Sequence, residues 1–137
     1  MERTAKHFRK RDAILTCLRG TTVHPSADWI YEQLKAEHSD ISLATVYRNL
    51  ALFKTQGIIN SLGTVKGVER FDGDTAPHVH FICTACHKVL DLSQIQVPEE
   101  LNTAAGRASG GEVESCQLTF RGSLLYIMFS TWIALFL

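Results

Sequence analysis

The chain has 137 residues, of which 45% are hydrophobic and 20% are charged. This composition excludes a disordered protein and predicts one ordinary globular domain or two small ones. The formal net charge is zero, yet residues 1–73 carry +3 and residues 74–137 carry −3. A basic half beside an acidic half suits a nucleic-acid-binding module joined to a second module. The charged N-terminus does not resemble a signal peptide, so we expect the four cysteines to lie in the reducing cytoplasm, as metal ligands or redox groups rather than disulfides.

The first helix is predicted from a basic stretch, residues 3–11, to Gly20, which ends it. Its apolar side consists of residues at helical spacing: Ala13, Ile14, Cys17 and Leu18. Cys17 is therefore expected to be a core residue. The basic stretch is either a solvated helix face or frayed arm without a binding role, or an arm that touches phosphates.

Two further helices are predicted from their capping residues. Ser26 caps a helix that ends near His38, and Ser42 caps a helix that runs to Gln56. The last helix presents an outer face of Thr45, Arg48, Asn49 and Leu52. Arg can bridge guanine and Asn can bridge adenine, so this face favours a helix-turn-helix motif with the last helix in the major groove. A plain three-helix bundle with a polar exterior is the alternative.

A hairpin is predicted over residues 58–72. Two β-prone runs, 58–62 and 68–71, flank a glycine-containing turn at 63–67 with Lys66 at its tip. A hairpin after the third helix makes a winged helix, in which Lys66 would touch the phosphate backbone. Residues 1–73 are accordingly predicted to form a winged-helix DNA-binding domain.

Residues 78–86 combine two metal-binding patterns. His78-x-His80 places two imidazoles on one side of a strand, and Cys83-x-x-Cys86 has the spacing of a zinc-binding turn. Asp72 and Asp91 flank the segment. Imidazole and carboxylate suit divalent iron, manganese or zinc, whereas thiolates suit zinc.

The second half is predicted to contain few elements. Strands are expected at 78–84, 88–92 and 112–121, and a helix at 98–108. Three strands and one helix are too few to form a stable domain alone, so we expect this half to pair with the same half of a second copy of the chain. The tail, 123–137, is apolar at twelve of fifteen positions and has no charge. As a helix it would reach about 22 Å, less than the roughly 30 Å of a bilayer core, so it is not expected to anchor the chain in a membrane.

Several motifs together resemble the ferric-uptake-regulator family of bacterial metal-dependent repressors. They span residues 8–122 and comprise the segments 24–31, 42–50 and 70–72 and the pattern His78-x-His80-x-x-Cys83-x-x-Cys86. The resemblance implies an α+β fold, with an N-terminal winged helix-turn-helix domain followed by a small α/β dimerisation domain at 78–122. It also implies a homodimer, an inverted-repeat operator in double-stranded DNA, no membrane and no enzymatic activity.

The resemblance assigns roles to individual residues. The regulatory site for Fe2+ or Mn2+ would consist of His24, Asp72, His78, His80 and Asp91. The DNA contacts would come from Thr45, Tyr47, Arg48, Asn49 and Lys66. Aspartate at both acidic positions is more similar to peroxide-sensing members, in which bound ferrous iron reacts with peroxide and a histidine ligand, here at position 24 or 78, is oxidised. Iron- or zinc-responsive repression is the alternative within the family.

The structural zinc site departs from the family pattern. Cys83 and Cys86 match the first Cys-x-x-Cys pair, but the expected second pair is absent after residues 118–122. Cys116 could supply a third ligand. His87 directly follows Cys86, so its side chain is poorly placed to point back toward the same ion. We therefore expect weak or absent Zn2+ binding, a less stable dimer and a form of the regulator impaired by this loss. A changed reading frame after about residue 122 would explain both the missing pair and the apolar tail.

Two alternative hypotheses assign the chain to other functional classes. A metal-dependent hydrolase or oxidoreductase could use His78, His80 and Asp72, but the sequence offers no obvious nucleophile or phosphate loop and little room for a substrate pocket. A zinc-stabilised module could bind DNA without sensing metal.

Overall fold

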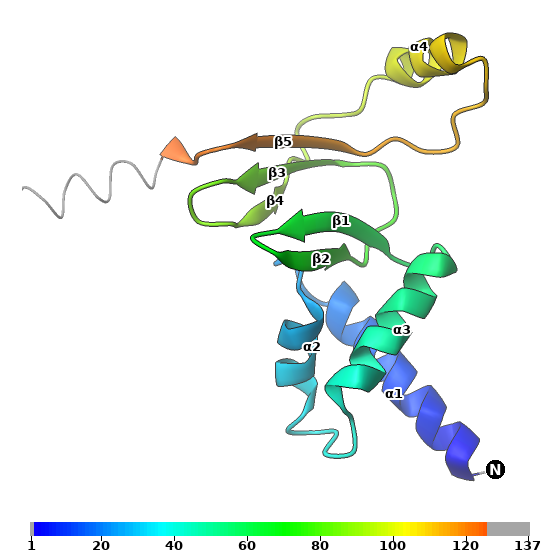
Figure 1. Cartoon of the computed structure of the whole chain (residues 1–137), viewed down its shortest axis with the longest axis vertical. Helices are drawn as coiled ribbons and strands as arrows, with labels where there is room; N and C mark the ends of the chain where they lie inside the picture. Colours follow the sequence, from blue (N-terminus) through cyan, green and yellow to red (C-terminus); the bar gives the residue numbers. More distant parts are fainter. Residues whose placement is uncertain (1, 126–137) are drawn as a thin grey trace, which may run out of the picture. The chain divides into compact units, whose positions relative to one another are not determined.

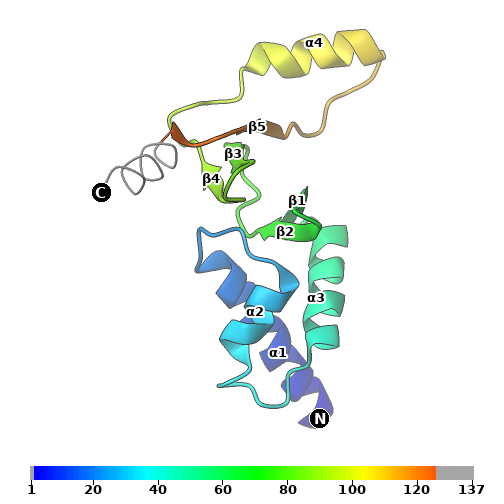
Figure 2. The same ribbon diagram turned by 60° about the vertical axis from the view of Figure 1, so that its left-hand side comes forward.

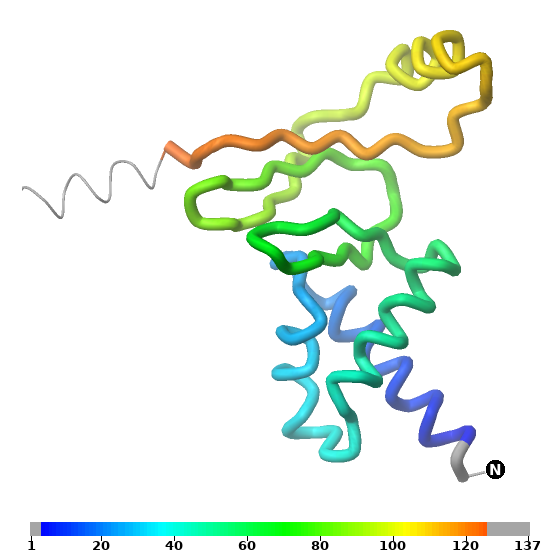
Figure 3. Tube along the Cα trace, in the orientation of Figure 1, coloured from blue at the N-terminus to red at the C-terminus, as the bar shows by residue number. Residues whose placement is uncertain are grey.

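The computed structural model describes residues 2–125 and divides the chain into two compact units, one ending at Thr75 and the other beginning at Ala76 (Figures 1 and 3). Among the described residues, the first unit holds three helices and a hairpin, and the second holds three strands and a helix. Most of the apolar tail, residues 126–137, lies outside the described residues. Within residues 2–125, no helix is both long and apolar enough to cross a membrane.

The three helices of the first unit are α1 (Glu2–Arg19), α2 (Ala27–Leu34) and α3 (Leu43–Thr55). Both predicted serine caps are confirmed: the Ser26 hydroxyl accepts from the Trp29 N–H and the Ser42 hydroxyl from the Thr45 N–H, each at 3.2 Å. Helix α2 ends at Leu34, so the prediction that it continues to His38 was wrong. The chain turns at 35–38 because Ile41, 5% exposed, must return to the core ahead of α3.

The core of the first unit is formed by side chains of the three helices and the hairpin, whose backbones are drawn in Figure 2. Its members are the buried apolar residues Ile14, Leu18, Ala27, Ile30, Leu34, Ile41, Val46, Leu50, Phe53, Ile59 and Phe71. Cys17 packs against this core and is partly buried, and burial raises the pKa of its thiol. Full burial of each large apolar side chain contributes about 1.5–3 kcal/mol, so packing holds the three helices together.

The wing consists of β1 (Asn60–Val65) and β2 (Val68–Asp72), paired antiparallel. Val65 pairs with Val68, which leaves a two-residue loop of Lys66 and Gly67 with φ values of 51° and 77°. Two left-handed residues make the type I′ turn that suits a twisted hairpin. The predicted turn at 63–67 was too long, because β1 continues past a bulge between Ser61 and Thr64.

The second unit contains β3 (Val79–Cys83), β4 (Val89–Asp91), α4 (Glu99–Ser109) and β5 (Leu118–Gly122). The strand order is β4-β3-β5, with β3 antiparallel to β4 and parallel to β5. The predicted strand at 112–121 begins only at Leu118, because Leu118 pairs with Val79, the first residue of β3. Strand β4 and a segment containing α4 lie between β3 and β5 in the chain, and they provide the long connection that two parallel strands require. The α+β fold class is confirmed, with a winged helix in the first unit.

Candidate functional site

Two of the predicted metal ligands lie together in the first unit. His24 belongs to the loop between α1 and α2, and Asp72 is the last residue of β2. The Phe71 N–H donates to the Pro25 carbonyl at 3.0 Å, which ties this loop to the end of β2. As a result His24 Nε2 lies 3.5 Å from Asp72 Oδ2, with both side chains buried. We call this pair the loop pair.

The other three predicted ligands lie together in the second unit. His80 on β3 stands opposite Asp91 on β4, and His78 lies two residues earlier on the same side of the sheet. The same oxygen, Asp91 Oδ1, is 3.3 Å from His78 Nε2 and 3.4 Å from His80 Nε2. Nδ1 of His78 makes a 2.7 Å hydrogen bond with the Ala76 carbonyl, which orients the ring so that Nε2 faces the carboxylate. We call these residues the sheet triad.

The spacing of these donor atoms suits a metal ion. The imidazole-to-carboxylate distances given above, 3.3, 3.4 and 3.5 Å, are longer than the usual N–H···O range of about 2.7–3.2 Å. Two ligands bound to one ion at about 2.1 Å are about 3.0 Å apart at a right angle and about 3.4 Å apart at a tetrahedral angle. The loop pair and the sheet triad each fit this spacing, and their nitrogen and oxygen atoms suit iron, manganese or zinc.

Cys83, the last residue of β3, and Cys86 belong to the turn between β3 and β4, residues 83–88, which we call the cysteine knuckle. The Cys86 N–H donates to Cys83 Sγ at 3.4 Å. This donor and, after it, the N–H of Leu124 lower the pKa of the Cys83 thiol to about 7. Within residues 2–125, no group of three or more His, Cys, Asp or Glu ligand atoms includes these thiols, so neither Cys116 nor His87 completes a zinc site there.

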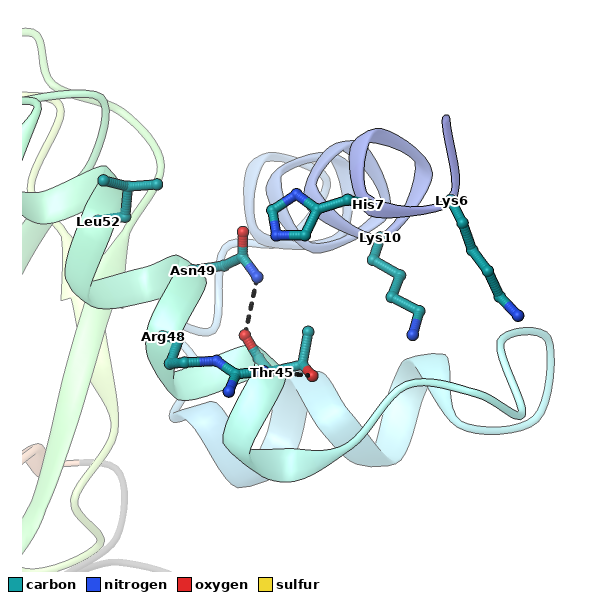
Figure 4. Close-up of a pocket in the computed structure, with 7 residues that line it drawn as sticks. All are labelled: Lys6, His7, Lys10, Thr45, Arg48, Asn49 and Leu52. Carbon is teal, nitrogen blue, oxygen red and sulfur yellow. Dashed lines mark hydrogen bonds between the residues drawn. The ribbon is translucent and has the colours of Figure 1, made fainter. Parts of the chain in front are cut away.

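The predicted DNA-contacting residues fall into two classes. Tyr47 and Arg48 on α3 and Lys66 at the hairpin tip are exposed, and Thr45 is partly exposed at the start of α3. Asn49 differs, because it is 5% exposed and its side-chain amide donates to the Thr45 carbonyl at 2.8 Å (Figure 4). The expectation that Asn49 lies on the outer face of α3 is therefore corrected, because its side chain is buried and held against its own helix.

A pocket of about 310 Å³ lies between parts of α1 and α3. Figure 4 shows its lining residues: Lys6, His7 and Lys10 on α1, and Thr45, Arg48, Asn49 and Leu52 on α3. Lys6 and Lys10 lie 3.3 and 3.2 Å from the Asp40 carboxylate. Hydrogen bonding by Lys10, above all, lowers the pKa of Asp40. The basic stretch is thus helical, and it ties α1 to the turn that precedes α3.

One polar contact of α3 was not predicted from the sequence. The Tyr47 hydroxyl donates to the Asp28 carboxylate on α2 at 3.0 Å. This bond raises the pKa of Tyr47, because the neighbouring negative charge disfavours the phenolate. It also fixes the direction of an aromatic ring that is 49% exposed. Both residues stand in the motifs named above, but nothing in their spacing reveals the pairing.

Comparison with known proteins connects these features to one family. The model of the ferric uptake regulator family matches residues 2–121. The peroxide-responsive repressor PerR of Staphylococcus aureus (strain USA300) is 41% identical over 90 residues, which cover 66% of this chain and 61% of that protein. The chain therefore spans about three fifths of the length of the curated relatives it matches.

Solved structures agree with this comparison. The peroxide stress regulator of Campylobacter jejuni has a TM-score of 0.78 and 27% identity, covering 90% of this chain and 91% of that one. The ferric uptake regulator of Pseudomonas aeruginosa, solved with manganese, has a TM-score of 0.65 and 26% identity, covering 83% and 86%. Because the family model spans most of its length, the chain belongs to the ferric uptake regulator family.

Proposed function

We propose that the chain is a metal-dependent, DNA-binding transcriptional repressor that senses peroxide. The observation that carries this proposal is the sheet triad, in which one Asp91 oxygen is within 3.4 Å of two imidazole nitrogens in the second unit of a chain whose first unit is a winged helix. Membership of a family of regulators supports repression over hydrolysis or redox catalysis as the function.

The regulatory ion in this proposal is Fe2+ or Mn2+, held jointly by the loop pair and the sheet triad. Each group presents imidazole and carboxylate atoms at a spacing that suits such an ion. The two groups belong to different units, so a shared ion would couple its binding free energy to the orientation of the winged helix. A form competent for DNA binding would then be selected by its additional ligands.

Peroxide sensing is supported by the 41% identity to a peroxide-responsive repressor. A ferrous ion held by these residues would supply the redox chemistry that activates hydrogen peroxide and would be unchanged in the net reaction. In the net reaction one oxygen atom of the peroxide is added to the His24 or His78 imidazole and the other leaves as water, so the ring loses two electrons. The oxidised ring is a poorer ligand, which weakens metal binding and releases the protein from DNA. A response to iron or zinc alone remains the alternative within the family.

DNA binding is assigned to α3 and the wing. Thr45, Tyr47 and Arg48 would face the major groove, where arginine recognises guanine, and Lys66 would touch a phosphate. Their exposure supports this assignment, whereas burial removes Asn49 from it. The partner would be double-stranded DNA carrying an inverted repeat, bound by a homodimer in the cytoplasm.

The proposed homodimer would form through the second unit. No residue of α4 is buried, and large apolar side chains of this unit are 37–44% exposed: Leu90, Ile95, Leu101 and Phe120. Burial against a second copy would remove this apolar surface from water.

The same unit holds the two-cysteine knuckle, for which we propose weak Zn2+ binding, because structural zinc requires four ligands.

Manganese binding tests the site directly. We expect electron paramagnetic resonance of the full chain to show one bound Mn2+ per chain, with affinity reduced at least about tenfold by Asp91→Ala or His80→Ala. His38→Ala is the matched control, since it removes an imidazole outside both groups. After loading with Fe2+ and exposure to peroxide, mass spectrometry should find one added oxygen on peptides containing His24 or His78. Affinity that is unchanged in both site variants would refute the proposed ligands.

A further inference from the structure

We propose that Arg70 is a positioning residue that pre-forms the loop pair by holding the main chain around His24. The inference rests on the proposed regulatory site, because it explains the conformation of this loop by its role in positioning a metal ligand. Arg70 Nε donates to the His24 carbonyl, and Arg70 Nη2 donates to the Val23 carbonyl at 2.6 Å. One side chain thus holds two consecutive carbonyls from a strand 46 residues further along the chain.

The loop requires such a restraint. His24 has a φ of 51°, in the left-handed region that residues with a Cβ rarely adopt. It is also followed by Pro25, whose ring further restricts the backbone of the preceding residue. A conformation of this kind persists only where surrounding contacts determine it. The two hydrogen bonds from Arg70 act on the residue whose backbone is strained and on the one before it.

Three consecutive residues of β2 hold three different parts of the loop. Arg70 binds the carbonyls at positions 23 and 24, and the Phe71 N–H binds the carbonyl of Pro25. Asp72 then faces the His24 imidazole at 3.5 Å. Because the Phe71 side chain is buried in the core, the strand that carries all three contacts is itself fixed. The loop pair is therefore assembled by the fold of the first unit before any ion arrives.

Lysine cannot replace this arginine. A guanidinium presents several N–H donors in a fixed plane and can serve two neighbouring carbonyls together, whereas an ammonium is a single flexible point charge. Arg70→Lys keeps the charge and removes the paired geometry. Arg11→Lys is the matched control in the same unit, because Arg11 also makes a side-chain hydrogen bond, to Gln56 at 2.9 Å, but does not hold the loop.

The test uses the full-length protein and three readouts: Mn2+ affinity, the melting temperature of the metal-free form, and the ratio of oxygen addition at His24 to that at His78 after loading with Fe2+ and exposure to peroxide. We expect Arg70→Lys to lower Mn2+ affinity at least about tenfold, as loss of a group that orients a ligand does. We also expect the oxidation ratio to fall at least threefold, with the control within twofold of wild type in both. A residue that merely stabilises the unit would lower the melting temperature and leave the ratio unchanged.

The outcomes separate this inference from the proposed function. Wild-type affinity and ratio in Arg70→Lys, with weakened binding in His80→Ala, would overturn the role of Arg70 and leave the regulatory site standing. Unchanged affinity in His80→Ala as well would overturn both.

A second measurement needs no variant, so it decides the matter even if Arg70→Lys does not fold. In the metal-free wild-type protein, nuclear magnetic resonance should show a coupling across the hydrogen bond between Arg70 Nε and the His24 carbonyl carbon. Absence of that coupling, together with rapid exchange of the Nε proton, would contradict a pre-formed loop.

Discussion

Replacement of Lys66 by Asn isolates the electrostatic contribution of the wing. Lys66 occupies the first position of the type I′ turn with a φ of 51°, and asparagine is favoured at that position. The substitution therefore removes a charge while keeping or improving the turn. Each phosphate contact contributes about 0.9 to the slope of log affinity against log salt, so two copies in a dimer contribute about 1.8. Doubling the salt concentration should then weaken the wild type about 3.5-fold more than the variant.

The assay is fluorescence anisotropy with a labelled duplex, selected from a random pool by the wild-type protein with Mn2+, at several salt concentrations. Arg107→Gln on α4 removes an equal charge from an exposed position outside the winged helix, so its slope should match the wild type. The melting temperature of Lys66→Asn should be equal to or above that of the wild type. An unchanged salt slope in Lys66→Asn would refute a phosphate contact at the wing.

Three further predictions concern other contacts. The Glu69 carboxylate accepts a 2.8 Å hydrogen bond from Lys54, which lowers the pKa of Glu69. Glu69→Gln should therefore reduce the free energy of unfolding by less than about 1 kcal/mol at neutral pH. Denaturation at a series of pH values should show this difference vanish as pH falls through the lowered pKa; a constant difference would contradict the ion pair. Asp28→Ala releases the Tyr47 ring, so the ratio of affinities for selected and scrambled duplexes should fall about fivefold, the loss of about 1 kcal/mol, and an unchanged ratio would deny Asp28 that role. Metal analysis of the purified chain should find less than one zinc per cysteine knuckle, whereas one tightly held zinc would show that other ligands complete the site.

Local signals in the sequence were sufficient for most of the fold. Ser26 and Ser42 cap helices because a hydroxyl there satisfies an N–H that has no partner within the helix. The extended chain at the start of β3 places His78, one residue before the strand, and His80 on one side, as their spacing predicted. These features depend on residues within four positions of one another, so they can be recognised without knowledge of the tertiary structure.

The features that were not predicted depend on the position of a residue around its helix axis, on strand direction, or on contacts between residues far apart in the chain. Asn49 was assigned to the outer face by its polarity, although it lies three residues after Val46 and four before Phe53, on the buried side of α3. The parallel pairing of β5 could not be read from a strand pattern, because alternation does not report strand direction. The hydrogen bonds from Arg70 to the carbonyls of residues 23 and 24 join segments far apart in the chain, so no local sequence pattern predicts them.

The most direct test of the central claim is the DNA affinity of the full chain as a function of Mn2+ concentration. We expect saturating Mn2+ to increase affinity for the selected duplex at least about tenfold, which corresponds to about 1.4 kcal/mol of coupling between ion and DNA. Asp91→Ala should remove this increase. Equal affinity with and without Mn2+ in the wild-type protein would contradict metal-dependent repression, whatever the strength of DNA binding itself.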